Sequence, residues 1–281
     1  METGKNKAGD KSCFGNTELK KNNLLVISSS ASNFLYSFID LKSYQCVGLC
    51  SIIKKETSFS NPNDVLDLVK EQPDLLKGFV RTKIVFTNRE CTLIPEEIFK
   101  EEDTEKYIDL LFPDTYSGNV HIMHLPSLEN YLVYKIPVAI DEFYKESFPG
   151  VVFEHSTGNL LSTLSRISFL KKNTLIHVNF SQKSFEVVMC KKGKLLFYNS
   201  FEYQTSEEIA YYILFALKQW EIEPEEVMVS GELNPDSDEL YWLKKYIPKV
   251  ISFPVDELLP YPASIENPSN YIGLLNPEVC E

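Results

Sequence analysis

The side chains whose types could most plainly bind a ligand lie in two short polar segments, each between two apolar stretches of the chain. They are the hydroxyl, amide and ammonium groups of Ser28, Ser30, Ser32, Asn33, Asn179, Ser181, Gln182 and Lys183. Such groups hydrogen-bond phosphate oxygens, and a lysine neutralises one phosphate charge. Serine and asparagine also occur in turns for local reasons, because their side chains bond to the nearby backbone. We favour structural turns over a phosphate site, and we predict no catalytic residue.

Metal-binding and nucleophilic motifs give no stronger candidate. His121 and His124 have a spacing that, on a strand, sends the two rings to opposite faces of the sheet. Unliganded histidines are therefore the favoured interpretation, and no metal site is predicted. The sequence contains no Walker loop, no Gly-x-Gly-x-x-Gly motif and no Gly-x-Ser-x-Gly motif.

Length and charge narrow the functional classes. A chain of 281 residues is long for one hydrophobic core and accommodates two lobes. The net charge of −12 repels a phosphate backbone, so no nucleic-acid partner is expected. The longest apolar run, 211–217, is far shorter than the roughly 20 residues of a membrane span. We therefore expect a cytoplasmic protein with no membrane partner.

Cysteine usage and the N-terminal composition carry two further expectations. The six cysteines include no Cys-x-x-Cys pair, so we predict reduced, packed thiols rather than a disulfide framework or a thiolate zinc site. Residues 1–22 are rich in Lys, Gly and Asn and lack hydrophobic periodicity. We predict that they form a disordered tail.

The elements that would position the polar segments occur in one order, repeated twice. The first copy is predicted as strands at 24–27, 34–40 and 44–49, a helix at 62–69 and a strand at 84–86. A strand near 151–155 and a helix at 159–170 then lead into the second copy. The second copy is predicted as strands at 175–180, 185–190 and 194–199, a helix from the capping box Thr205-Ser-Glu-Glu208 to about Trp220, a strand at 227–230, a helix at 238–246 and a strand at 250–253. The two meanders align without a gap at an offset of 151 residues. We therefore predict an internal duplication of one β-β-β-α-β-α-β unit.

The domain boundaries follow from this repeat. The predicted units are a first lobe at 23–170 with an insertion at about 95–148, a second lobe at 171–254 and an extended C-terminal strap at 255–281. The insertion is expected to hold helices at about 97–111 and 138–148 around a hairpin of 121–125 and 130–134. Five prolines from residue 254 onward exclude regular structure in the strap. Its expected anchors are Tyr271, Ile272, Leu274 and Leu275.

Two surface patterns bear on possible partners. Glutamates and aspartates gather at 221–226 and 232–239, which we interpret as a solvated face rather than a binding surface for a basic partner. The aromatic residues Tyr211, Tyr212 and Phe215 are predicted to pack in the core rather than at an interface. The sequence names no partner and no oligomeric state.

The doubled unit resembles the actin, hexokinase and Hsp70 superfamily, whose halves are each similar to ribonuclease H. The segments 194–203, 209–215 and 229–232 are similar to a bacterial family, domain of unknown function 3822, with an actin-like ATPase fold. The resemblance covers about 24–254 and implies an α/β protein of two ribonuclease H-like lobes. The matching motifs are family markers with no assigned chemistry, so the resemblance implies fold and not function.

ATPases of that superfamily hold phosphate in the turn between the first two strands of each half. Asp-x-Gly there supplies a carboxylate for metal-bound water and a glycine for close backbone approach. Here the two turns read Ser28-Ser29-Ser30 and Asn179-Phe180-Ser181, which offer neither. Ser230-Gly231-Glu232 keeps one of the paired glycines expected at the adenosine site.

Two functional hypotheses follow. The first is a non-catalytic interaction or scaffolding protein with degenerate nucleotide-binding turns, an unknown protein partner and no cofactor. The alternative is a magnesium-dependent nucleotide-binding ATPase or kinase. In that case Mg-ATP would be bound by Ser28, Ser30, Asn33, Asn179, Ser181, Lys183 and Gly231, with Glu232 as a possible source of the metal-binding carboxylate.

Overall fold

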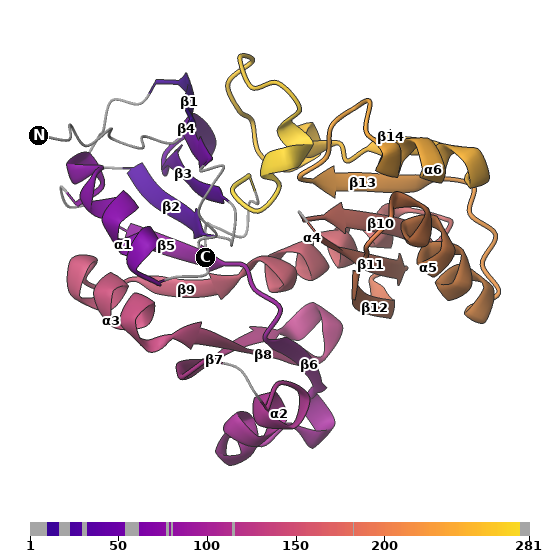
Figure 1. The fold of residues 1–281 in the computed structure, drawn as a ribbon, viewed down its shortest axis with the longest axis horizontal. Coiled ribbons are helices and arrows are strands. Elements are labelled where there is room, and N and C mark those ends of the chain that lie inside the picture. The colour runs from indigo at the N-terminus through magenta and orange to yellow at the C-terminus, as the bar shows by residue number, and fades with distance from the viewer. Residues whose placement is uncertain are drawn as a thin grey trace, which may run out of the picture.

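The chain forms two lobes side by side, with an insertion that projects below them (Figure 1). The computed structural model describes residues 10–16, 23–29, 33–53, 62–76, 79, 81–113, 116–181 and 183–275. Within these ranges, every helix is too short or too polar to cross a lipid bilayer.

The first lobe is built on a mixed six-stranded sheet in the order β1-β4-β3-β2-β5-β9. Its strands are β1 (Asp10–Gly15), β2 (Asn23–Ser29), β3 (Asn33–Asp40), β4 (Gln45–Ile53), β5 (Arg81–Phe86) and β9 (Val152–His155). Strands β2, β3 and β4 form the predicted antiparallel meander, and β5 and β9 extend it in parallel. The near-continuous apolar run of β2 suits a central strand that is buried on both faces. Helices α1 (Pro62–Lys70) and α3 (Val138–Ser147) cover one face, and the 3₁₀ turn η1 (Pro73–Leu76) follows α1.

The prediction of a disordered tail is wrong for residues 10–15, which form β1. This strand pairs antiparallel with β4 and places Cys13 opposite Cys50, and the two cysteines form a disulfide. The expectation of six reduced thiols is therefore also wrong, although Cys46, Cys91 and Cys190 are free. An edge strand is stabilised by its neighbour, so its own sequence carries little periodic signal. Residues 1–9 and 17–22 lie outside the described residues.

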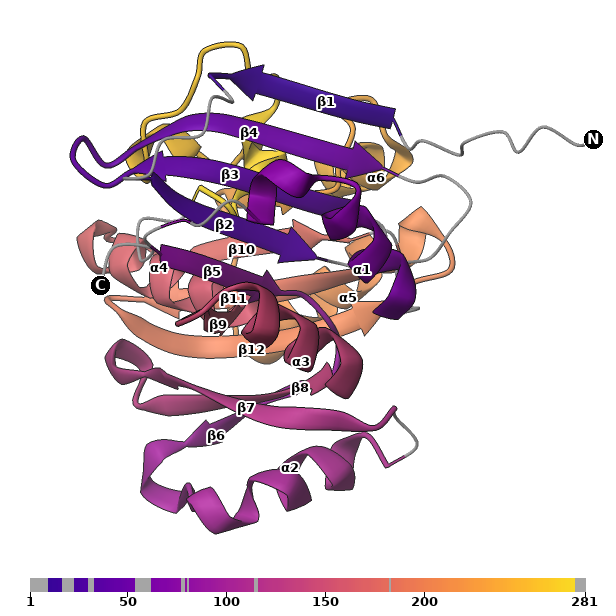
Figure 2. The ribbon, with the colours of Figure 1, turned by 90° about the vertical axis from the view of Figure 1, so that its left-hand side faces the viewer.

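The insertion holds its own three-stranded antiparallel sheet, in the order β6-β8-β7 (Figure 2). Its elements are β6 (Cys91–Pro95), η2 (Glu96–Ile98), η3 (Glu101–Asp103), α2 (Thr104–Leu111), β7 (Gly118–Leu125), η4 (Pro126–Leu128) and β8 (Asn130–Pro137). The predicted hairpin is confirmed, with both strands longer than expected. The helix expected at 97–111 is instead divided into two 3₁₀ turns and α2.

The second lobe repeats the architecture on a five-stranded sheet in the order β12-β11-β10-β13-β14. Its strands are β10 (Leu175–Phe180), β11 (Ser184–Lys191), β12 (Lys194–Glu202), β13 (Val227–Gly231) and β14 (Val250–Ser252). Its helices are α5 (Ser206–Gln219) and α6 (Asp238–Tyr246), and α4 (Ser156–Leu170) leads in from the first lobe. The bounds predicted for β10 and α6 are confirmed.

The two sheets share one topology, in which three antiparallel strands are followed by two parallel ones. The 151-residue offset relates β2 to β10 and β3 to β11. Each meander also carries a β-bulge at corresponding positions, between Phe38 and Ile39 in the first and between Met189 and Cys190 in the second. These matched irregularities are what a duplication predicts, because related folds retain their bulges.

A single apolar core joins the lobes. It combines residues of the first sheet, the insertion, α4, the second sheet and the C-terminal segment, among them Val26, Leu132, Leu161, Val188 and Leu274. Two further cores lie under the outer helices, one in each lobe. The space between the lobes is therefore packed rather than open at this level.

The C-terminal segment 255–275 crosses from the second lobe back to the first, and we call it the strap. It contains only the 3₁₀ turns η5 (Val255–Glu257) and η6 (Pro268–Tyr271), as the prolines predicted. Its predicted anchors Ile272, Leu274 and Leu275 are buried, which confirms them, and Tyr271 packs on Phe14 of β1 with ring centroids 6.3 Å apart. Against the first lobe, Pro260 accepts a backbone hydrogen bond from Cys46 at 2.9 Å.

Candidate functional site

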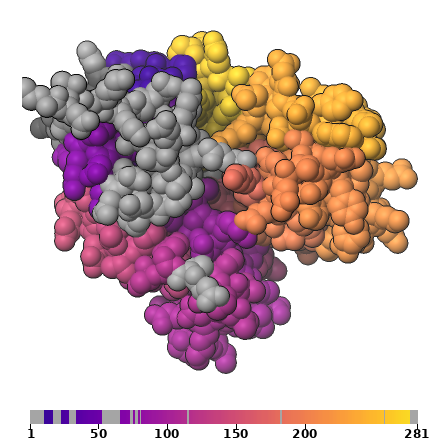
Figure 3. Space-filling view, in the orientation of Figure 1, coloured from indigo at the N-terminus to yellow at the C-terminus, as the bar shows by residue number. Residues whose placement is uncertain are grey.

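A polar cleft of about 680 Å³ lies where the second lobe, the insertion and the start of α4 meet. In the space-filling view the insertion stands apart from the second lobe at this place (Figure 3). The residues that line the cleft include Arg89, Thr92, Leu93, Leu111, Phe112, Ser156, Thr157, Ser181, Lys183, Ser184, Glu186, Tyr198, Asn199, Ser200, Glu202 and Glu232.

A smaller space of about 90 Å³ adjoins the cleft, deeper between the lobes. Four predicted site residues line it, namely Ser28, Asn179, Ser181 and Gly231. Lys183 lies in the larger cleft instead. Asn33 begins β3, whereas Ser30 lies outside the described residues together with Ser32 and Gln182. The structure thus brings Ser28 of the first lobe and Asn179, Ser181 and Gly231 of the second to one place between the lobes.

The second turn is a tight hairpin between β10 and β11. The backbone N–H of Ser181 donates to the carbonyl of Ser184 at 2.9 Å, and the carbonyl of Lys183 accepts from Tyr203 at 3.2 Å. The side chain of Lys183 is exposed in the cleft and forms no ion pair with a residue in the described part of the chain. Its ammonium is therefore a positive charge that a ligand in the cleft could meet.

Gly231 is required by the close approach of two backbones. Its φ is +89°, and a Cβ there would overlap the carbonyl oxygen of Phe180 and lie 2.8 Å from the side-chain oxygen of Asn179. Strand β13 runs parallel to β10 at this point, and the N–H of Glu232 donates to the same Phe180 carbonyl at 2.9 Å. Its observed role is therefore structural, whatever ligand lies nearby.

Asn179 is engaged inside the protein through both atoms of its amide. Its Nδ2 donates to Glu186 Oε2 at 2.9 Å, and its Oδ1 accepts from the hydroxyl of Ser230 at 2.9 Å. Glu186 accepts two more hydrogen bonds, from Thr157 at 2.6 Å and from Tyr198 at 2.9 Å. One carboxylate thereby ties together strands β10, β11 and β12 and the first turn of α4.

Sequence reasoning missed this network. Its one trace in the sequence is a lone glutamate in the otherwise apolar strand 185–190. Burial and the neighbouring Glu186 charge raise the pKa of the Tyr198 phenol well above its usual value. Burial is also the main cause that raises the pKa of the Cys91 thiol to about 12. Both groups therefore stay protonated at neutral pH.

The start of α4 is fixed by a buried histidine. His155 caps the helix, with Nδ1 accepting from the N–H of Thr157 at 3.2 Å and Nε2 donating to Asn88 Oδ1 at 2.9 Å. Burial lowers its pKa to about 3. Beside it, Glu154 pairs with buried Lys83 and accepts from Asn159 at 2.9 Å. The interlobe helix is thus held in place by hydrogen-bonded polar groups.

The strap closes the smaller space from the side of the C-terminus. Residues 270–274 line it together with Asn179 and Gly231. Leu274 and Leu275 are buried in the core that joins the lobes, and η6 packs on β13. Residues of the strap therefore form one side of the small space beside the predicted turns.

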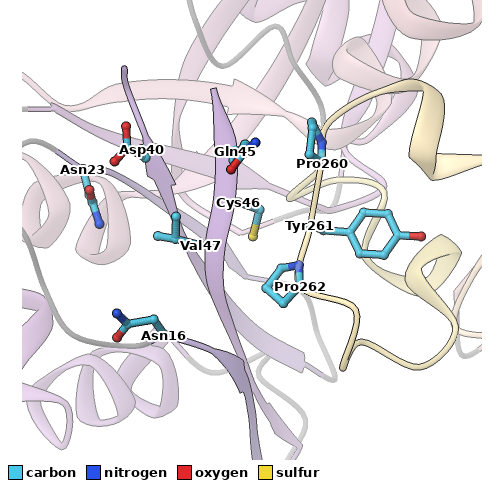
Figure 4. A pocket seen from close by; sticks show the side chains of 9 residues that line it. All are labelled: Asn16, Asn23, Asp40, Gln45, Cys46, Val47, Pro260, Tyr261 and Pro262. Atoms are coloured by element: carbon cyan, nitrogen blue, oxygen red, sulfur yellow. The ribbon is translucent and has the colours of Figure 1, made fainter. Parts of the chain in front are cut away.

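A second hollow of about 410 Å³ lies at the other end of the first sheet, between β4 and the strap (Figure 4). Pro260, Tyr261 and Pro262 border it from the strap. Its lining includes the buried Asn23, whose side-chain amide forms no hydrogen bond with a described residue. Asn23 and Ser28 stand at opposite ends of β2, so this hollow is separate from the predicted turns.

The two histidines of the insertion do not converge. His121 bonds to the buried Asp141 carboxylate at 3.0 Å, which Lys145 also contacts at 2.6 Å. His124 instead stacks on Tyr131, with ring centroids 4.5 Å apart. Among the described residues, no group of three His, Cys, Asp or Glu side chains is placed to hold a metal ion.

The aromatic run on α5 is more exposed than predicted. Tyr212 is half-buried and stacks on Phe201 of β12. Tyr211 and Phe215, however, are 63% and 50% exposed, so the prediction that they lie in the core is wrong. On a helix these two residues share the stripe that faces away from the sheet, which their apolar character did not reveal.

The chain belongs to the family described as protein of unknown function (DUF3822), whose model matches residues 14–250. No curated protein matches it. Among solved structures it is similar to a Bacteroides thetaiotaomicron protein with an actin-like ATPase fold and unknown function. The identity is 23%, the TM-score is 0.71, and the match covers 83% of this chain and 91% of the other.

A second solved structure, a PilM-PilN type IV pilus biogenesis complex, matches with 11% identity and a TM-score of 0.56. That match covers 93% of this chain and 100% of the other. Both likenesses show the fold alone. The chain therefore has the actin-like ATPase architecture of two α/β lobes, as the sequence predicted.

Proposed function

We propose that this member of the family is a non-catalytic, cytoplasmic interaction protein, which keeps the actin-like fold as a scaffold and binds another protein. The observation that carries the proposal is the closure of the space between the predicted turns. About 90 Å³ remains there, because the strap lies beside Gly231 and Asn179. Binding pockets for small molecules and cofactors usually measure about 300–1,000 Å³.

The chemistry of the turns supports the same proposal. The Asn179 amide is already bonded to Glu186 and Ser230, so it is held away from a phosphate. The carboxylate of this network, Glu186, already accepts three hydrogen bonds from protein groups. Binding Mg²⁺ there would break bonds that hold three strands and a helix together.

The continuous core between the lobes supports it as well. Leu24 of the first lobe, Leu175 of the second and Leu275 of the strap belong to one buried cluster. A nucleotide cycle that opens and closes two lobes would expose this apolar surface, at about 25 cal/mol for each Å². A scaffold avoids that exposure, because its lobes stay in one arrangement.

A protein of this fold occurs in a complex with another protein, the PilM-PilN assembly. That fact concerns PilM and PilN, and it shows only that the fold is compatible with binding a protein. Function lies in sites and not in folds, so it supports the class of function and names no partner for this chain.

The alternative, a magnesium-dependent nucleotide-binding ATPase or kinase, has one specific observation in its favour. The larger cleft, at about 680 Å³, has room for a nucleotide, and Lys183 lies in it without an ion-pair partner among the described residues. A phosphate beside Lys183 would therefore be the first thing to look for.

The deciding experiment measures the thermal unfolding midpoint with and without millimolar Mg-ATP. A ligand at 100 times its dissociation constant adds about 2.7 kcal/mol of stability, which raises the midpoint by several degrees. We expect no change. A rise that needs both magnesium and ATP, and that Lys183→Ala removes, would sink the proposal.

Two choices keep this test interpretable. Lys191→Ala is the matched control, because Lys191 is exposed at the far end of β11, the strand that follows Lys183, and it does not line the cleft. Substitution of Gly231 is avoided, because any side chain there would strike the Phe180 carbonyl and disrupt the site for reasons unrelated to nucleotide.

A further inference from the structure

The last strand of the second meander, β12, has an edge that no described strand pairs with. It stands at the end of its five-stranded sheet and has nine residues. On this edge the N–H of Ser200 bonds to the side-chain oxygen of its neighbour Asn199 at 2.9 Å. Because alternate N–H groups of an edge strand point away from the sheet, Ser200 marks the outward set.

The outer edge of β12 forms one wall of the 680 Å³ cleft. Tyr198, Asn199 and Ser200 all line it, although consecutive strand residues point to opposite faces. Tyr198 and Ser200 share one face of the sheet with Ser184, Glu186 and Glu202, whereas Asn199 points to the other face. The cleft therefore lies on that shared face and reaches the outer edge of β12 at Asn199 and Ser200. The opposite wall includes the consecutive residues 91–93 of β6, which is likewise the last strand of its sheet.

The first lobe shows what occupies the corresponding edge. Strand β4 holds the same place in the first meander as β12 in the second, and its outer edge is covered by β1. That strand is six residues long and antiparallel. An extended segment is thus the kind of element that this edge accepts in the same architecture.

We infer that an extended peptide segment of a partner protein docks in the cleft by adding a strand to β12. This inference rests on the proposed function, since it gives the interaction protein its binding site. Main-chain hydrogen bonds to an open edge supply affinity in such complexes, and alternate side chains supply specificity.

The lining of the cleft specifies the chemistry of the peptide. Leu93, Leu111 and Phe112 form an apolar wall, and Leu111 is 55% exposed. The exposed Lys183 lies in the same cleft and has no ion-pair partner among the described residues. The peptide therefore carries apolar side chains at alternate positions and an acidic side chain near Lys183.

A cleft bounded on both sides by strand edges favours a single strand over a second copy of the chain. A second copy would bring its whole sheet and the helices on it toward β12, where β6 and the end of α2 stand across the cleft. Pairing between two β12 strands is therefore an outcome that the test must detect.

The probe is a phage-displayed library of random linear twelve-residue peptides, selected on the full-length protein. We expect enriched sequences with alternating apolar residues and an acidic residue. Their binding should shift the amide NMR signals of Tyr198, Ser200 and Glu202. Ser200→Pro removes one outward N–H without touching the ladder to β11, so it should weaken the selected peptide by more than about tenfold.

Matched variants separate the binding site from general surface effects. Leu111→Asp should weaken the peptide about tenfold, whereas Leu110→Asp should change affinity less than about twofold, because Leu110 is 81% exposed but does not line the cleft. Lys183→Glu should weaken binding, and Lys191→Glu should not. Ser200→Ala keeps the N–H and should bind normally. Circular dichroism and the thermal midpoint verify that each variant is folded.

Three results would overturn the inference: no enriched peptide, equal binding by Ser200→Pro, or amide shifts confined to α5 and α6. Sedimentation velocity tests for a fourth such result. If the wild-type protein dimerises and Ser200→Pro abolishes the dimer, then a second copy of the chain, and not a peptide, pairs with the edge of β12. The same protein sample is titrated with Mg-ATP. No peptide and no effect of Mg-ATP would reject this inference alone, whereas a Mg-ATP response would reject the proposed function.

Discussion

The two lobes share one topology, but the third strand of the meander is an inner strand of its sheet in the first lobe and an edge strand in the second. In the first lobe, β1 covers the edge of β4, and the Cys13–Cys50 disulfide joins the two strands. In the second lobe, no strand in the described part of the chain lies beside the outer edge of β12. Unpaired edges are usually blunted because they invite other chains. The outer edge of the meander is therefore covered in the first lobe, whereas among the described residues it is uncovered in the second, where we propose that a peptide binds.

The lobes also differ at the end of the fourth strand. In the first lobe β5 ends at Phe86, which lies opposite Ser29 of β2. In the second lobe β13 ends at Gly231, pressed against Phe180. The end of β13 therefore requires a glycine, at the place where the first lobe has Phe86.

Gly231→Ala tests this difference and has the largest expected effect. The new Cβ would overlap the Phe180 carbonyl, and a side chain at φ +89° is strained in any case. We expect a loss of about 4 kcal/mol or more in the free energy of unfolding, measured by urea denaturation.

Gly150→Ala is the control for this prediction. Gly150 also has a positive φ, +74°, but no atom lies within 4 Å of the place that a Cβ would take. Gly150→Ala should lower the free energy of unfolding by only about 1 kcal/mol, which is the cost of placing a side chain in the left-handed conformation. Equal losses for the two variants would mean that the close approach of β10 and β13 contributes nothing.

The covered edge of the first lobe gives the second prediction. Cys13 and Cys50 are 37 residues apart, and a bridge of this span stabilises a protein by about 4 kcal/mol in the loop-entropy account. We expect the double variant Cys13→Ser, Cys50→Ser to lose about that amount, measured by urea denaturation. Adding a reductant to the wild type should produce the same loss.

The double variant also provides the control, because reductant should leave its unfolding midpoint unchanged. Edge exposure adds a second readout. If β1 protects β4 as proposed, the double variant should exchange the amide hydrogens of β4 faster, while those of β12 stay as they are. Unchanged exchange in β4 would contradict a protective role for β1.

The sequence predicted the elements whose signals are local. The alternation and turns of 175–199 indicated the second meander, and the 151-residue offset related it to the first. Strand β1 escaped prediction because its stability comes from β4, whose first residue lies 30 positions beyond the last residue of β1. The disulfide escaped with it, since only the strand pairing brings Cys13 and Cys50 together.

The sequence pointed to residues that lie near one another, but it did not predict their hydrogen bonds or the segments that pack beside them. Ser28 and Asn179, one from each predicted turn, both line the small space between the lobes. The bond from Asn179 to Glu186 depends on the register of the hairpin between β10 and β11, and residues 270–274 line the space beside it from a distant segment of the chain. Single-residue types carry no record of such contacts.

The third prediction compares two buried histidines. His155, in the first lobe, has hydrogen bonds to both ring nitrogens, whereas His177, in the second, has none to a described residue and packs edge-on against Phe253. Burial lowers the pKa of each to about 3. The unfolded chain binds protons at these rings below pH about 6.5, and the folded chain does not, so stability is lost as the pH falls from about 6.5 toward 3.

Each histidine should therefore account for a loss of about 2 kcal/mol of stability between pH 7 and pH 5. His177→Leu should remove its share of that loss while leaving stability at pH 7 nearly unchanged, because it deletes a buried polar group without partners among the described residues. His155→Leu should remove a similar share but lose about 1–2 kcal/mol at pH 7, since it breaks the α4 cap. Guanidinium denaturation at both pH values distinguishes the two. An unaltered pH dependence in both variants would show that other groups govern acid unfolding.

The smallest effect concerns the start of α5, just after the open strand β12. The capping-box prediction paired the Thr205 hydroxyl with the Glu208 N–H and the Glu208 carboxylate with the Thr205 N–H, but the Thr205 side chain makes no capping hydrogen bond. Glu208 instead accepts from the N–H of Gln204 at 2.9 Å, which ties the helix to the chain leaving β12. Thr205→Ala should therefore lose only about 0.3 kcal/mol and Glu208→Ala about 1 kcal/mol, read from urea denaturation. A larger loss of stability for Thr205→Ala than for Glu208→Ala would support the capping box. It would contradict the role of the Glu208 bond to Gln204 in joining α5 to the chain that leaves β12.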